Sequence, residues 1–252
     1  MRTILLFTLM YLLIQSCYGQ KITESLERFE EPHVVQLEND IKLVSFGSVN
    51  MFKRDFFPAS FMIESNDKIV FIDTLIVDST KKADFIFITH AHIDHLYMAD
   101  IEKITHENTL IICPKKAAKK LENYNHTIVK PGEKLEFGEI ICETYPSYSV
   151  GTPTHPKNNE NLSYVITVNG IRFFHPGDSD VIPELQRIKN IDVAMVPIDG
   201  GVLAMKTDEA SKLINTMKPK KVIPMHYEIN KGKTPEFRRL VNKGIEVIIL
   251  EE

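Results

Sequence analysis

The sequence lacks several features that would each indicate a particular class of protein. Its 252 residues include only three cysteines, and none has a partner at C-x-x-C spacing, which argues against a cysteine-based zinc site. The formal net charge is −4 and the isoelectric point is about 6.2, whereas nucleic-acid-binding domains are usually basic. We therefore expect no nucleic-acid partner. Tryptophan is absent, and we attach no function to that absence.

The first 19 residues differ in composition from the rest of the chain. Arg2 is their only charged residue, an apolar run extends from Ile4 to Ile14, and small residues follow up to Gly19. A basic start, a short apolar run and a small-residue cleavage zone are typical of a secretory signal peptide, and this run is too short to span a bilayer comfortably. Cys17 leaves an alternative open, in which this cysteine is lipidated and anchors the protein to a membrane.

The remaining residues, 20–252, are predicted to form one exported domain that is periplasmic, secreted or held at the envelope by lipid. Their composition fits one large core, since 43% of the chain is hydrophobic and 25% is charged. Cys113 and Cys142 each lie in a strand-like apolar run. A disulfide between them and a pair of buried free thiols are both compatible with export. No pattern predicts the oligomeric state.

Apolar runs and turn residues predict strands interleaved with helices, which is typical of the α/β class. A polar, irregular lead-in with at most one helical turn is expected over residues 21–40, and loops over 50–59 and 146–161. A loop as long as the second one is usually functional in a compact domain. We expect helices over residues 96–104, 207–218 and 235–242, and strands over residues 41–46, 60–63, 68–73, 85–89, 139–145, 162–168, 171–174, 191–196, 221–224 and 245–250.

Two helical features are expected in detail. Thr207 precedes two acidic residues and is predicted to cap the N-terminus of its helix. Between Pro114 and Asn125, four lysines at i, i+4 spacing would share one helical face. Such a face is usually a solvated one, although it could also meet anionic lipid or a phosphorylated substrate.

The most informative stretch is Phe85–His95, where a short apolar run ends in a cluster of polar side chains. The run is β-branched and aromatic and too short for a helix, so it predicts a buried strand. The first two histidines follow at a spacing of two, which places both imidazoles on one side of an extended backbone. Zinc accepts imidazole and carboxylate ligands. The candidate metal ligands here are His90, His92, Asp94 and His95.

Three further ligand-type residues, His155, Asp178 and His226, also come after apolar strands. Because strand ends in a layered fold meet at one edge, a site can form there from residues that are distant in sequence. Asp73 ends another predicted strand near this edge, and two roles are open for it: a turn cap, or a hydrogen-bond acceptor for a ligand histidine. His175 lies three residues before Asp178 and is expected to pack against the site or support it.

The motif His90-x-His92-x-Asp94-His95 resembles the signature of the metallo-β-lactamase-fold hydrolases. The stretches Gly177-Asp178-Ser179 and Pro224-Met225-His226 resemble the branch of metal-dependent hydrolases that includes the ascorbate-phosphate lactonase. The resemblance extends from about Ile41 to the C-terminus. It implies an α/β fold, the four-layer αβ/βα sandwich, with two β-sheets face to face and helices outside.

The resemblance also implies two metal sites that share one ligand. One zinc would be held by His90, His92 and His155, the other by Asp94, His95 and His226, and Asp178 would bridge both. Zinc is the expected metal, and Mn²⁺ or Fe²⁺ could use the same ligands. Di-iron relatives have Glu at the position of His92, and metallo-β-lactamases generally lack the bridging carboxylate, so neither oxygen reduction nor antibiotic hydrolysis is the first expectation.

The implied chemistry is hydrolysis of an ester, lactone or phosphodiester bond in a small molecule. A hydroxide bridging the two metals would attack the substrate. Asp94 or Asp178 would pass a proton to the leaving group, and Tyr227 or His175 would donate a hydrogen bond to the substrate. Two other functions stay open: a non-catalytic metal-binding envelope protein, and a metallo-β-lactamase.

Overall fold

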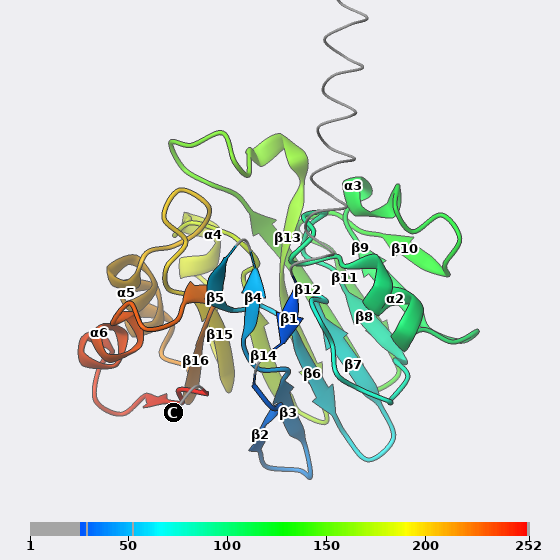
Figure 1. Ribbon diagram of the computed structural model, residues 1–252, viewed down its shortest axis with the longest axis horizontal. Coiled ribbons are helices and arrows are strands. Elements are labelled where there is room, and N and C mark those ends of the chain that lie inside the picture. Colours follow the sequence, from blue (N-terminus) through cyan, green and yellow to red (C-terminus); the bar gives the residue numbers. More distant parts are fainter. Residues whose placement is uncertain (1–25, 29, 52, 251–252) are drawn as a thin grey trace, which may run out of the picture.

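Two β-sheets lie face to face in the computed structural model, and helices cover their outer sides (Figure 1). The structure describes residues 26–28, 30–51 and 53–250, so the predicted signal peptide and Cys17 lie outside the described residues. Within those ranges, no helix is both long enough and apolar enough to cross a bilayer. The layered architecture confirms the predicted αβ/βα sandwich.

The first sheet has seven strands, and four neighbouring strands at one side of it run parallel. The antiparallel remainder comes from the N-terminal part of the chain. The strand order is β10 (His126–Ile128), β9 (Leu110–Cys113), β8 (Phe85–Phe87), β7 (Ile69–Ile72), β6 (Phe61–Glu64), β3 (Lys42–Ser45) and β2 (His33–Gln36).

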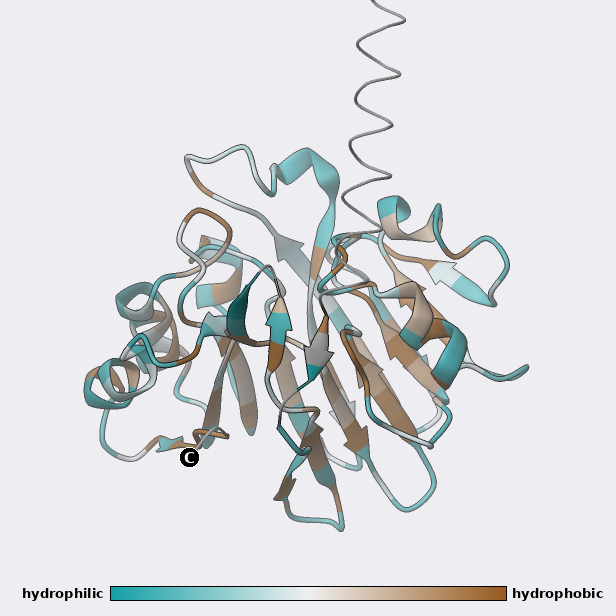
Figure 2. Cartoon of the chain, in the orientation of Figure 1, coloured by the Kyte–Doolittle hydropathy of each residue, from teal (hydrophilic) through white to brown (hydrophobic). Residues whose placement is uncertain are grey.

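Apolar side chains alternate between the two faces of this sheet. In β7, Val70 and Ile72 belong to the core between the sheets, and Phe71 belongs to a second core beneath α2 (Met98–Ile104) and α3 (Lys115–Ala118). The period of two follows from strand geometry, and it explains why these short strands are apolar on both faces. In Figure 2 many strands of the two large sheets are hydrophobic, whereas the helices mix hydrophobic and hydrophilic residues.

The second sheet also has seven strands, and its last four are parallel. The connections between these parallel strands contain three helices: α4 (Pro183–Gln186), α5 (Thr207–Met217) and α6 (Lys233–Leu240). The strand order is β11 (Lys134–Phe137), β12 (Ile140–Ser147), β13 (Asn161–Val168), β14 (Ile171–His175), β15 (Val193–Pro197), β16 (Lys221–Met225) and β18 (Glu246–Val247).

A small third sheet pairs an N-terminal hairpin with the segment that follows β16. Its central strands, β4 (Val49–Met51) and β5 (Arg54–Phe57), pair with each other, and β5 pairs with β17 (Tyr227–Glu228). The fourth strand is β1 (Glu27–Arg28). The hairpin is thereby held beside His226, directly at the end of β16.

Several predicted elements are wrong. Residues 21–40 were expected to be irregular, but they contain β2, whose side chains are alternately half-buried and exposed. Residues 50–59 were expected to be a loop, but they contain β5, and the left-handed φ of 63° at Lys53 belongs to the turn before it. In β2 the exposed positions are Val34 and Gln36, so polar and apolar residues do not alternate with burial. In β5 the first two residues, Arg54 and Asp55, are both exposed and charged, which hid the strand.

Three predicted boundaries also differ from the structure. The basic helix over 114–125 is limited to α3, after which the chain forms turns. The strand over 245–250 is reduced to β18 at the sheet edge. Thr207 is the first helical residue rather than the cap, and its hydroxyl donates to the carbonyl of Ile198 at 2.8 Å. The N-cap is Lys206, whose backbone N–H donates to Glu209 Oε2 at 2.9 Å.

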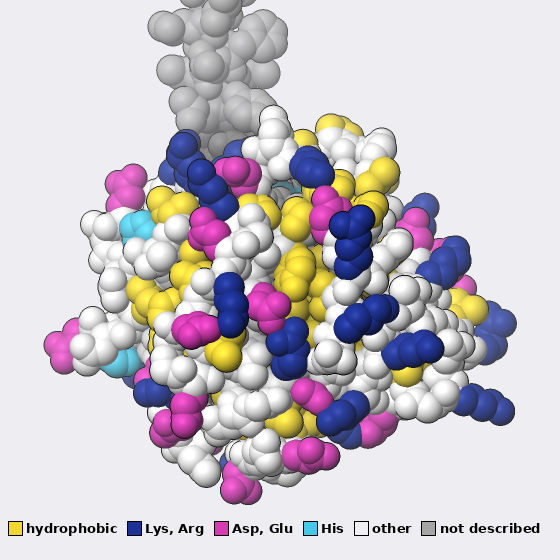
Figure 3. Space-filling view, turned by 180° about the vertical axis from the view of Figure 1, so that it is seen from behind, with side chains coloured by type: hydrophobic (Ala, Val, Ile, Leu, Met, Phe, Trp, Pro, Cys, Tyr) yellow, Lys and Arg dark blue, Asp and Glu magenta, His cyan; other side chains and the backbone are white. Residues whose placement is uncertain are grey.

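Cys113 and Cys142 are buried free thiols, so the structure contains no disulfide between them. Burial raises the pKa of Cys113 to about 12, and burial followed by the charge of Glu143 raises the pKa of Cys142 further. Thiols of this kind behave as small apolar side chains. On the surface, acidic and basic residues are interspersed over the described part of the face in Figure 3.

Candidate metal centre

The predicted ligands meet at the edge where strands of both sheets end. The segment after β8 turns back on itself, because the N–H groups of His95 and Leu96 both donate to the carbonyl of His92, at 3.2 and 2.8 Å. The turn brings the side chains of the H-x-H-x-D-H motif together. Asp178 follows β14, and His226 follows β16 with a left-handed φ of 51°.

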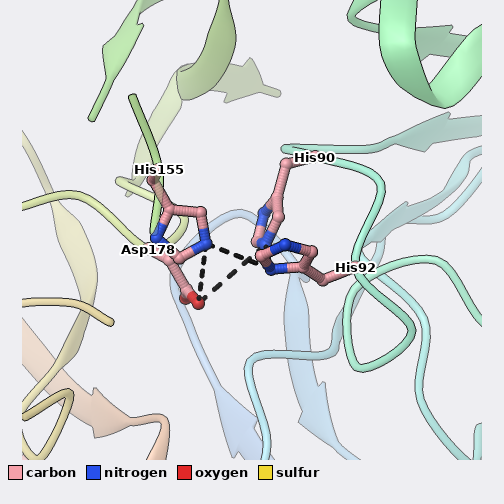
Figure 4. Close-up of side chains that lie close together, drawn as sticks. All are labelled: His90, His92, His155 and Asp178. Atoms are coloured by element: carbon pink, nitrogen blue, oxygen red, sulfur yellow. Dashed lines mark hydrogen bonds and ion pairs between the residues drawn. The ribbon is translucent and has the colours of Figure 1, made fainter. Parts of the chain in front are cut away.

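The first group of candidate ligands consists of His90, His92, His155 and Asp178 (Figure 4). His92 Nδ1 lies 3.0 Å from His90 Nε2 and 3.1 Å from His155 Nε2. Asp178 Oδ2 lies 3.9 Å from His90 Nε2 and 3.8 Å from His155 Nε2. His92 is exposed and the other three are buried, so this group is open on one side only.

The second group consists of Asp94, His95, His226 and again Asp178. His226 Nε2 lies 3.4 Å from Asp94 Oδ2 and 3.3 Å from Asp178 Oδ2. His95 Nε2 lies 3.2 Å from Asp178 Oδ1. In each group the candidate ligand atoms lie within 4.8 Å of one another, and Asp178 is the residue that the two groups share.

Buried polar atoms without a hydrogen bond mark the second group as a site for a cation. Among the described residues, His95 Nε2, His226 Nε2 and Asp178 Oδ1 are buried and make no hydrogen bond. Such atoms are rare in folded proteins and require an explanation. Because two imidazole nitrogens and a carboxylate oxygen converge, a bound metal ion would give all three atoms a partner. The residues present therefore fit the expected metal pair.

Asp73 and Thr89 set the orientation of two ligand imidazoles. Asp73 Oδ2 accepts hydrogen bonds from Thr89 Oγ1 at 2.8 Å and from His95 Nδ1 at 2.6 Å. Since Thr89 Oγ1 gives its only proton to Asp73, it must accept from His90 Nδ1 at 3.0 Å. Both imidazoles therefore keep a proton on Nδ1, which leaves Nε2 as the nitrogen that can bind a metal ion in each group. Of the two roles open for Asp73, the geometry favours the hydrogen-bond acceptor.

His175 lies outside both groups and supports Asp178 through the backbone. Its Nε2 donates to the carbonyl of Ala59 at 2.9 Å, and its Nδ1 accepts from the N–H of Gly177 at 3.1 Å. Burial lowers the pKa of His175, in agreement with a neutral ring that donates on one side and accepts on the other. His175 thus fixes the residue before Asp178, and its buried ring makes no direct contact with the pocket.

The protonation states of the site residues favour binding of a cation. Burial alone would raise the pKa of Asp178, but His226 and His95 outweigh it and hold that pKa well below its usual value. Burial, with His95 beside it, lowers the pKa of His90. For His226, burial opposes protonation, yet Asp178 and Asp94 raise the pKa to about 9. Without metal, protons on imidazoles therefore balance the carboxylates, and metal binding must displace them.

A cavity of about 500 Å³ opens onto the second metal group. The ring of Phe56 meets the ring of His226 edge-on, with centroids 4.9 Å apart. The 50–59 segment contributes both to the cavity and to the core, because Met51 and Phe56 line the cavity and Phe57 is buried in the core. The lining consists of Met51, Arg54, Phe56, His92, Ile93, Asp94, Asp178, Leu203 and His226.

Tyr227, predicted as a hydrogen-bond donor to the substrate, is not among the residues that line this cavity. Its ring is buried in the core and stacks on Phe57, with centroids 5.3 Å apart. The prediction relied on the position of Tyr227 next to His226 in the sequence and did not include the short strand β17, which begins at Tyr227. The pairing of Tyr227 with Phe57 of β5 holds its ring in the core, away from the site.

Other supporting residues were missed by sequence reasoning. Lys120 Nζ donates to the carbonyl of Ala91, inside the motif, at 2.7 Å, although it was expected only as part of a basic face. Ser149 Oγ lies 3.4 Å from His155 Nδ1, and Thr89 and Arg54 were not singled out. A threonine at a strand end or an arginine in a hairpin carries no sequence signal of its own.

Gly177 is required by both its conformation and its surroundings. Its φ is 59°, and a Cβ added there would lie 2.9 Å from Thr89 Cβ and 3.1 Å from Thr89 Oγ1. We expect Gly177→Ala to lower the free energy of unfolding by roughly 2–4 kcal/mol, from left-handed backbone strain and crowding together. Urea unfolding would measure the change.

Gly170→Ala is the matched control for Gly177→Ala. Gly170 has a φ of 82°, and a Cβ added there would meet nothing within 4 Å. It should therefore show the backbone strain alone, roughly 1–2 kcal/mol. Equal losses in the two variants would mean that Thr89 does not crowd position 177.

Comparison with known proteins agrees with this geometry. The family model described as the beta-lactamase superfamily domain matches residues 56–226. A UPF0173 metal-dependent hydrolase from Nanoarchaeum equitans is 32% identical over 208 residues, which cover 77% of this chain and 94% of that protein. The chain belongs to the metallo-β-lactamase superfamily. Within this superfamily it is a metal-dependent hydrolase, as the resemblance predicted.

Comparison with solved structures confirms the fold. The crystal structure of a protein from Parabacteroides distasonis, described as a metal-dependent hydrolase, superposes with a TM-score of 0.73 at 26% identity, covering 88% of this chain and 99% of that one. A diiron β-hydroxylase from Streptomyces venezuelae gives a TM-score of 0.61 at 13% identity, covering 77% of this chain and 52% of that one. Since one fold carries such different chemistry, the reaction must be argued from the site.

Proposed function

We propose that the protein is a binuclear zinc hydrolase that acts outside the cytoplasm on an ester, lactone or phosphodiester bond of a small molecule. The observation that carries this proposal is the position of Asp178, which contributes to both groups of candidate ligands while 2% exposed. A shared carboxylate is the arrangement by which two metal ions can be held side by side. A single-metal site would leave the second group of buried ligand atoms without a function.

Zinc is the preferred metal because the donor set is dominated by imidazole. Five histidines and two aspartates make up the two groups, and imidazole suits zinc, whereas sites built from oxygen ligands suit magnesium and manganese. Imidazole also binds iron, so manganese and iron stay as alternatives. Metal exchange with each ion, followed by activity, distinguishes them.

When bound, such a metal pair supplies a water nucleophile of lowered pKa and polarises the substrate oxygen that gains charge. The chain's own residues do the rest. Asp94 is the partly exposed carboxylate of the second group, 18% exposed, and lines the cavity, so it can pass a proton to the leaving group. Asp178 is buried beneath it and holds the two groups in register. His92 is exposed and lines the cavity, so a substrate can reach the metal groups from that side.

Replacing His92 tests the ligand assignment. His92→Ala should lower the zinc content of residues 20–252 from about two ions per chain to about one, since one group loses a ligand. Elemental analysis of protein purified without chelator measures this. His126→Ala, a change to a half-buried histidine of β10 outside both groups, should keep both ions. Unchanged metal content and activity in His92→Ala would refute the assignment.

Two alternative functions predict different outcomes for a substrate screen. A metal-binding envelope protein without turnover would retain zinc and hydrolyse no lactone, ester or phosphodiester. A metallo-β-lactamase would hydrolyse a chromogenic cephalosporin. The complete pair of ligand groups and the open cavity favour turnover, and the carboxylate of Asp178 between the groups favours the first proposal over the lactamase.

Export is proposed from the sequence of residues 1–19 alone. Sequencing the N-terminus of the mature protein would test it, because cleavage after Gly19 leaves Gln20 first. A blocked, lipid-bearing Cys17 would instead indicate anchoring to a membrane. An intact Met1 would argue against both.

A further inference from the structure

The cavity above the second metal group combines an unpaired cation with apolar walls. Arg54 lines it and is exposed, and its side chain forms no hydrogen bond or ion pair with another described residue. It lies on β5, where its backbone pairs with Met51 across the hairpin. A guanidinium that no carboxylate of the described residues neutralises is available to an anion that enters the cavity.

The walls of the cavity are apolar. Met51, Phe56, Ile93 and Leu203 line it together with the metal-group residues. At about 500 Å³ the cavity is within the range that encloses much of a small organic ligand. Phe56 is held in place by its edge contact with His226, so at least one apolar wall is fixed relative to the reacting groups.

The apolar lining continues outward from Leu203. Val202 is 64% exposed, Leu203 is 40% exposed, and Val150 on the neighbouring loop is 61% exposed. The two loops are joined, because Thr152 Oγ1 and Thr154 Oγ1 both donate to the carbonyl of Val202, at 3.1 and 2.6 Å. Both loops project on the same side of the molecule in Figure 1. Large apolar side chains exposed together at the mouth of a cavity commonly mark a binding surface.

We propose that the cavity selects an amphiphilic anion: a substrate with an apolar chain or ring and, apart from the bond that is cleaved, an acidic group that pairs with Arg54. This inference rests on the proposed hydrolase function and narrows its substrate class. With two divalent cations bound, the charge of the metals exceeds that of Asp94 and Asp178, so the whole cavity favours an anion. The acidic group is a carboxylate or a phosphate, which share this chemistry.

Binding of straight-chain hydroxamic acids to the zinc-loaded protein tests the proposal without requiring turnover. The hydroxamate end binds the metals, and the far end is a carboxylate or, as the neutral match, a carboxamide. Calorimetry over chains of increasing length should reveal a length at which the carboxylate form binds about tenfold more tightly than the carboxamide, the effect of one charge-assisted contact. A phosphonate end shows whether phosphate is the better anion.

Two neighbouring variants make this test specific. In Arg54→Gln the preference for the anionic end should fall to about one. In Lys53→Gln, which removes the same charge from an exposed residue outside the cavity lining, the preference should stay near its original value. Equal binding of the two ends at every length, or a preference that survives in Arg54→Gln, overturns the proposal. If no hydroxamate binds at all, the metal-site proposal itself fails, and the inference fails with it.

The apolar half of the inference has its own readout. Affinity of methyl-ended hydroxamates should rise with chain length, and Leu203→Asn should weaken the long chains several-fold while acetohydroxamate changes little. Val34→Asn is the control, since Val34 is a 58% exposed valine on β2 that does not line the cavity or its mouth. An affinity that is independent of chain length would show that the walls do not hold an apolar group.

Discussion

Replacing Asp178 with asparagine is expected to lower hydrolysis by on the order of 10³-fold, the effect of several kcal/mol of lost charge stabilisation. Asparagine keeps the shape of the side chain and removes its charge. Asp178 lies within 3.2–3.3 Å of His95 Nε2 and His226 Nε2 and within 3.8–3.9 Å of His90 Nε2 and His155 Nε2. No other described residue belongs to both ligand groups, so one substitution would affect both of the proposed metal ions.

Metal content separates this explanation from general damage to the fold. Asp178→Asn should bind fewer than two zinc ions per chain by elemental analysis, and its circular dichroism should match that of the unchanged protein. Asp208→Asn is the control, because Asp208 is an exposed carboxylate on α5 paired with Lys212 at 2.8 Å. If Asp178→Asn keeps both ions and full activity, Asp178 does not bridge the metals.

Much of this site could be predicted from the sequence because its ligands follow buried strands. The segment 85–88 is apolar, and the ligands begin within three residues of its end, so the change from strand to site is visible in one window. The same holds for Asp178 after β14 and His226 after β16. Within each sheet, parallel strands place their C-terminal ends together, which accounts for the ligands after β8 in one sheet and after β14 and β16 in the other. His155 is the exception, because it lies in the loop between the antiparallel strands β12 and β13.

The cavity around the ligands could not be predicted in the same way. Its walls come from the β4–β5 hairpin and from the loop after β15, and both depend on tertiary pairing. The hairpin reaches the site only because β5 pairs with β17, a strand of two residues. A two-residue strand has no periodicity to detect. Nothing in the sequence therefore indicated that Arg54 lies near His226.

The ligands could be predicted from the sequence, whereas most of the residues that support them could not. A metal ligand is recognisable by type and spacing, whereas Thr89, His175 and Gly177 act through single hydrogen bonds or close contacts. Asp73 was an intermediate case. Its position at a strand end suggested either a cap or an acceptor, and only the 2.6 Å contact with His95 Nδ1 distinguishes the two.

Asp73→Asn is expected to weaken zinc binding at the second group by about 10- to 100-fold, the usual cost of losing a residue that orients a ligand. Asp73 is fully buried and has a φ of 51°, a conformation that asparagine tolerates well, so the backbone should be little disturbed. The carboxylate accepts three hydrogen bonds, from Thr89 N, Thr89 Oγ1 and His95 Nδ1, at 2.8, 2.8 and 2.6 Å. An amide has one oxygen for these three donors.

The physical reason for the loss is the tautomer of His95. With an amide –NH₂ facing Nδ1, the imidazole is favoured with its proton on Nε2, the nitrogen that the second group needs unprotonated. Competition with a chelator gives the zinc affinity of each site. Because the ligands themselves remain, excess zinc should restore much of the activity of Asp73→Asn, whereas it should not restore Asp178→Asn. Thr89→Ser is the control, because it keeps the hydroxyl and should bind zinc normally. An unchanged zinc affinity in Asp73→Asn would show that the site does not depend on the hydrogen bond between Asp73 and His95.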